Sequence, residues 1–117
     1  MNAQLCMQLF TLFAGLADGL PYQALLDAAA DECRQQLREG ADVNDTRLAY
    51  YIAALANLRY VQMLAARSTL SHTYAGTLAK AHDETAPCGF AERLVSEYRA
   101  AASDLLIDRR FVFTGIG

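Results

Sequence analysis

Proline, the strongest helix breaker, is scarce in this sequence, which has only two prolines and no tryptophan among its 117 residues. Hydrophobic residues make up 54% of the chain, and alanine and leucine are the most frequent of them. Because both are good helix formers, the composition predicts an all-α protein. A chain of this length buries enough surface for one hydrophobic core. We therefore expect a single helical domain over residues 1–117, with a helical body over 1–107 and an extended tail over 108–117.

The sequence also lacks a strong excess of charge of either sign. Ten basic and thirteen acidic residues give a formal net charge of −3 and a pI near 5.2. General nucleic-acid binders carry a basic face, so this balance argues against that class. The apolar N-terminal run "LCMQLFTLFAGLADGL" has no basic segment before it and reaches Asp18 too early to span a bilayer. We expect neither a signal peptide nor a membrane protein.

Cysteine is too sparse for a disulfide framework. Cys6, Cys33 and Cys88 are odd in number and far apart, whereas small secreted domains use dense, even sets and zinc sites use close pairs. We expect reduced thiols, with Cys33 packed as a small hydrophobe on an apolar helix face.

The residue types that carry catalysis are equally few. His72 and His82 are the only histidines, and their spacing matches no standard zinc pattern. Cys88 would need one of them as a base, and its surroundings "PCGF" offer no oxyanion-binding context. We predict no catalytic residue, no metal ligand and no cofactor, and so a non-enzymatic protein. An enzyme that uses Cys88 with His72 or His82 is a competing interpretation.

Four segments show the hydrophobic periodicity of helices. The first covers roughly residues 3–17 and has Leu5, Leu9, Leu12, Phe13 and Leu16 at helical spacing. The second begins at Pro21 and ends at Gly40. The third covers 47–67, with Asn44 or Asp45 as its N-terminal cap, and the fourth covers 90–107.

The third of these segments is apolar around almost its whole circumference, so it is expected in the middle of the bundle. The internal polar exceptions are Asn57, Arg59 and Gln62. We expect Arg59 to be a structural arginine whose charged end reaches the edge of the bundle. Pairing with Asp27, Asp31 or Glu97 across the bundle and a contact between protomers are the alternatives.

A polar segment over residues 68–86 separates the third and fourth helices. Its residues predict a short loop or β-hairpin around Gly76, carried by His72, Tyr74, Gly76, Lys80 and His82. A frayed helix over 75–81 is the alternative. The expected fold is thus a compact four-helix bundle with a short loop or β-hairpin between its last two helices.

The tail "DRRFVFTGIG" is unusually apolar for a chain end. Each buried apolar side chain contributes about 1.5–3 kcal/mol, but ordering the backbone costs about 1–2 kcal/mol per residue. A tail folded onto its own domain would barely break even, whereas one added to a neighbour also gains backbone hydrogen bonds. We therefore predict a homo-oligomer whose partner-binding residues are Phe111, Val112, Phe113 and Ile116 in the tail, and Leu5, Leu9, Leu12 and Phe13 in the apolar first helix.

The segment "CRQQLREGADVNDTRLAYYIAALANLRYVQML", the following "YAGTLAKA" and the closing helix resemble head–tail connector, or head-completion adaptor, proteins of tailed phages and prophages. The similarity covers about residues 22–110. It implies a structural protein that forms a ring below the portal and joins the capsid portal to the tail. Residues 68–86 would be its hairpin or channel-side loop and residues 111–117 its docking strand.

The resemblance also implies portal and tail proteins as partners, with DNA at most passing through a channel, no membrane and no small-molecule substrate. Such a protein would be found in the cytoplasm of the bacterial host during assembly and in the virion afterwards. The competing interpretation is a small cytoplasmic helical regulator or chaperone that covers its apolar helix by forming a dimer.

Overall fold

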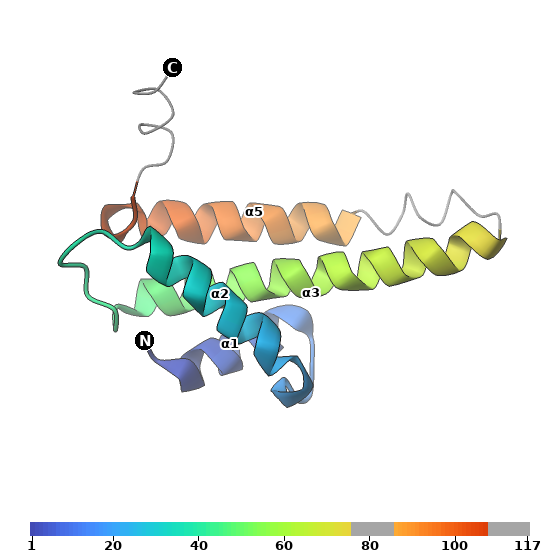
Figure 1. Ribbon diagram of the computed structural model, residues 1–117, viewed down its shortest axis with the longest axis horizontal. Coiled ribbons are helices and arrows are strands. Elements are labelled where there is room, and N and C mark those ends of the chain that lie inside the picture. The colour runs from blue at the N-terminus through green and yellow to red at the C-terminus, as the bar shows by residue number, and fades with distance from the viewer. Residues whose placement is uncertain (76–85, 108–117) are drawn as a thin grey trace, which may run out of the picture.

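The structure is a computed structural model that describes the backbone of residues 1–75 and 86–107 and the side chains of 1–67 and 88–107. Within these ranges the chain forms four helices and no strand, which confirms the all-α four-helix prediction. The elements are α1 (Ala3–Ala14), a 3-10 turn η1 (Leu20–Tyr22), α2 (Gln23–Gln36), α3 (Thr46–Ala75), α5 (Ala86–Ala101) and a second 3-10 turn η2 (Ser103–Leu105) (Figure 1).

Helix α3 is the centre of the bundle, as its all-round apolar surface predicts. Helices α1, α2 and α5 all pack against it, with α5 and α1 on opposite sides in Figure 1 and α2 crossing in front. The largest fully buried side chains come from α1, α2, α3 and the segment that follows α5: Phe10, Cys33, Leu48, Ile52 and Leu106. Helix α5 itself packs Val95 and Tyr98 against this core. The core is therefore continuous across the four helices.

Helix α1 is capped at both ends by its own sequence. The Asn2 side chain accepts the Leu5 backbone N–H at 3.1 Å, and Gly15 ends the helix with φ 69°, a left-handed conformation that suits glycine. The helix ends at Ala14 rather than at the expected residue 17. A short connection and η1, which contains Pro21, then lead into α2.

One residue of α1 that was predicted to bind a partner is buried in the hydrophobic core of its own chain. Leu9 is only 8% exposed and belongs to the chain's own core, so its assignment to a partner surface was wrong. Leu5 and Phe13 are half-buried against that core, whereas Leu12 is 73% exposed. The physical reason is that α1 lies on α3 along one face and leaves only its outer face uncovered.

Helix α2 ends at Gln36, earlier than the expected stop at Gly40. Leu37 is extended there and forms an isolated antiparallel bridge with Leu106. The Arg38 N–H donates to the Leu105 carbonyl at 2.9 Å, and the Ile107 N–H donates to the Gln36 carbonyl at 2.7 Å. This pairing also explains why the last helix ends at Ala101 and not at residue 107, since residues 37 and 106 must both leave the helical conformation to form the bridge.

Helix α3 starts as expected and runs further than expected. The Asp45 carboxylate accepts the Arg47 backbone N–H at 2.9 Å, so Asp45 is the N-terminal cap. The helix continues through Ala75, and the prediction that His72 and Tyr74 belong to a loop or hairpin was therefore wrong. Serine and threonine lower helix propensity by only a few tenths of a kcal/mol each, which does not stop a helix that is already formed.

The rest of the predicted hairpin, including Gly76, Lys80 and His82, lies outside the described residues. The next helix, α5, starts at Ala86, four residues before the expected start at Phe90. Pro87 is accommodated because it falls in the first turn, where a missing N–H costs no helical hydrogen bond.

Candidate functional site

A cleft of about 780 Å³ opens between α1, α3 and α5. Helix α1 contributes Phe13, α3 contributes Asn57 and Leu64 among others, and α5 contributes Phe90 and Leu94. No residue of α2 lines it. A volume of several hundred Å³ with mostly apolar walls is typical of a binding site.

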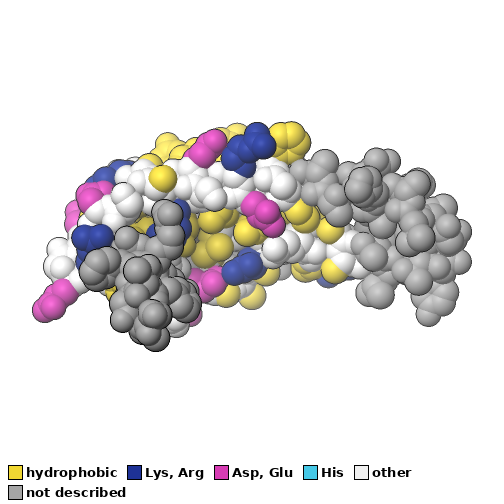
Figure 2. Space-filling view, turned by 90° about the horizontal axis from the view of Figure 1, so that it is seen from above, with side chains coloured by type: hydrophobic (Ala, Val, Ile, Leu, Met, Phe, Trp, Pro, Cys, Tyr) yellow, Lys and Arg dark blue, Asp and Glu magenta, His cyan; other side chains and the backbone are white. Residues whose placement is uncertain are grey.

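The mouth of the cleft exposes large hydrophobic side chains to solvent. Phe90 is 67% exposed and Leu64 is 41% exposed. The Arg93 guanidinium lies 5.7 Å from the centre of the Phe90 ring, so the aromatic face is partly covered by a cation. Figure 2 shows hydrophobic side chains reaching the surface beside acidic and basic ones along the upper edge of the view. Contiguous exposed apolar surface is typical of interaction sites.

The wall of the cleft contains one buried amide without a partner. Asn57 is 6% exposed, and among the described residues its Oδ1 atom accepts no hydrogen bond. Buried polar atoms are nearly always paired, and leaving one unpaired costs on the order of 1–3 kcal/mol. The described part of the chain therefore leaves this acceptor unpaired, and its accessible surface of less than 1 Å² means that neighbouring atoms cover it.

Aromatic rings hold the helices around the cleft in place. Tyr60 packs edge-on against Phe10 and Tyr22, with ring centroids 6.1 and 4.9 Å away. Phe13 of α1 stacks on Tyr98 of α5 at 5.8 Å, and this contact joins the two helices that form the sides of the cleft. Burial raises the pKa of the Tyr60 hydroxyl, so this side chain stays neutral at physiological pH.

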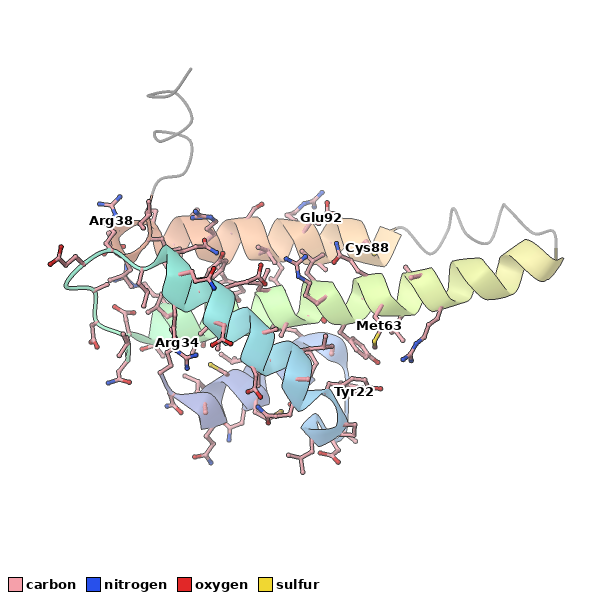
Figure 3. The ribbon with its side chains drawn as sticks, viewed as in Figure 1. Tyr22, Arg34, Arg38, Met63, Cys88 and Glu92 are labelled. Atoms are coloured by element: carbon pink, nitrogen blue, oxygen red, sulfur yellow. The ribbon has the colours of Figure 1, made fainter. Side chains whose placement is uncertain are left out.

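The thiols are divided between the core and the start of α5. Cys6 and Cys33 are buried, and loss of solvation raises the pKa of both, that of Cys33 to about 11. Because the thiolate is the nucleophile, burial and a raised pKa make these two thiols poor nucleophiles. Cys88 is half-buried and lies in the first turn of α5, at the opposite end of the bundle from Arg38 (Figure 3).

The partners proposed for Cys88 in catalysis, His72 and His82, have side chains outside the described set. Among the residues that the structure does describe, no group of three or more histidine, cysteine, aspartate or glutamate side chains could hold a metal ion. None of the described helices combines the length and the apolar character that crossing a membrane requires.

The structure brings some of the sequence-predicted binding residues together and separates others. Phe13 lines the cleft, whereas the exposed Leu12 beside it does not. The four tail residues Phe111, Val112, Phe113 and Ile116 lie outside the described ranges. Arg59 pairs with Glu32 of α2 at 3.2 Å, an acidic residue that was not among the three considered as its partners.

Asn57 is the residue whose role the sequence did not reveal. The sequence did mark its position as unusual, since Asn57 is one of few polar residues in an otherwise apolar helix. Periodicity marks such a residue as an exception, but it cannot say whether the side chain finds a partner.

Comparison with family models, curated proteins and solved structures found no match to this chain in any of the three sets.

Proposed function

We propose that this chain is a non-enzymatic structural assembly protein of a phage or prophage, which joins the capsid portal to the tail as a ring-forming head–tail connector. The observation that carries the proposal is the open apolar cleft with Phe90 and Leu64 exposed at its mouth. Such a surface favours association, because burying each large side chain contributes about 1.5–3 kcal/mol.

The resemblance to connector proteins gives this tendency to associate a specific role. The similar region, about residues 22–110, includes α2, α3 and α5, and so includes two of the three helices that form the cleft. In a closed ring each copy contacts the next through the same pair of surfaces, so a single kind of contact forms every interface. The partners are then further copies of the chain, the portal and the tail proteins, and DNA at most passes through the channel. The protein would act in the cytoplasm of the bacterial host during assembly and remain in the virion.

The test is the oligomeric state over a wide range of concentrations, measured by light scattering after size exclusion and by native mass spectrometry. We expect oligomers that grow with concentration and appear as rings by electron microscopy, either alone or after mixing with the portal protein of the same phage or prophage. Phe90→Glu should weaken assembly at least tenfold. Leu20→Glu is the matched control, since Leu20 is 68% exposed and outside the cleft, whereas Phe90 is 67% exposed and inside it.

Two outcomes contradict the proposal. A stable dimer at every concentration favours the dimeric regulator or chaperone. A chain that remains monomeric both alone and with the portal protein excludes the connector function.

A further inference from the structure

We draw no further inference here: the strongest candidate, the apolar cleft between α1, α3 and α5 with Phe90 and Leu64 exposed at its mouth, belongs to the site already described, and nothing in the structure shows what covers it.

Discussion

Two buried side-chain amides, Gln36 at the end of α2 and Asn57 in α3, differ in whether their oxygen atoms accept a hydrogen bond. Gln36 is 8% exposed, accepts a hydrogen bond from the Tyr51 hydroxyl at 3.0 Å and donates one to the Glu32 carbonyl at 3.3 Å. Asn57 is 6% exposed, and its Oδ1 has no partner among the described residues. The oxygen of the first amide is paired, whereas the buried oxygen of the second is left unpaired by the described residues.

The surroundings of each amide extend the contrast. Around Gln36 lies what we call the closed end, formed by the Leu37–Leu106 bridge and by Arg47, which donates to Asp104 at 2.7 Å, to Asp45 and to the Ala101 carbonyl. Around Asn57 lies the cleft with exposed Phe90. The comparison indicates that the closed end provides stability, whereas binding at the cleft is part of the proposed function.

Thiol reactivity should show the largest difference between the two regions. Cys33 is fully buried and its pKa is raised to about 11 by loss of solvation, whereas Cys88 at the start of α5 is half-buried. We expect a thiol reagent at pH 8 to label Cys88 at least about a thousandfold faster than Cys33, which reacts only after the core opens. Mass spectrometry of digested protein after timed labelling measures both rates. Comparable rates would mean that the core around α2 is open in solution.

Truncation of leucine should have the next largest effect. Leu106→Ala at the closed end removes a side chain that is 1% exposed, and it should lower the free energy of unfolding by about 2–5 kcal/mol. Leu64→Ala at the mouth of the cleft removes one that is 41% exposed, and the loss should stay below about 1 kcal/mol. Urea denaturation followed by circular dichroism gives both values. Similar losses at the two sites would remove the distinction between closed and open regions.

Replacement of the two amides should have smaller effects of opposite sign. Gln36→Leu leaves the Tyr51 hydroxyl unpaired and should destabilise the protein by about 1–3 kcal/mol, whereas Asn57→Leu removes an unpaired acceptor and should be neutral or stabilising by about 1 kcal/mol. The same denaturation curves measure both changes. As a control, Tyr51→Phe should reproduce much of the loss seen for Gln36→Leu. A clear loss for Asn57→Leu would indicate that its amide already has a partner.

The smallest effect is the pH dependence of the ion pairs at the closed end. Hydrogen bonds from the Arg47 guanidinium hold the pKa of Asp45 and Asp104 below the ordinary value of 3.8. Since these pKa values are lower in the folded than in the unfolded chain, the stabilisation is present above pH 4 and is lost as pH falls through the lowered values. The Tm difference between wild type and Asp104→Asn should therefore be positive at pH 7 and shrink toward zero in stronger acid. In protein that also carries Arg47→Met, the Tm difference caused by Asp104→Asn should no longer depend on pH.

The local features of the fold could be predicted from the sequence because they depend on neighbouring residues. The cap at Asp45, which was one of two candidates, and the position of α3 inside the bundle each follow from a short stretch of chain. The errors came where a distant segment intervened. Helix α2 ends at Gln36 because Leu37 pairs with Leu106, a residue far along the chain, and no pattern around Gly40 contains that information.

The candidate site was less predictable than the fold. Phe13 was expected to bind a partner and lines the cleft, but Leu9 from the same apolar pattern is buried in the core. Helical spacing identifies an apolar face and cannot divide it between the molecule's own core and a neighbour. His72 and Tyr74 were misplaced because a weak local preference for a loop gave way to the continuing helix α3.

By itself, the sequence determined that this protein is helical, how many helices it has in the described ranges and which of them is central, because backbone propensity and hydrophobic period act over a few residues. Only the tertiary structure decided that Gln36 is satisfied and Asn57 is not, and that α1, α3 and α5 leave a cleft. Those outcomes depend on where side chains from separate helices meet, and that meeting is fixed by packing of the whole chain.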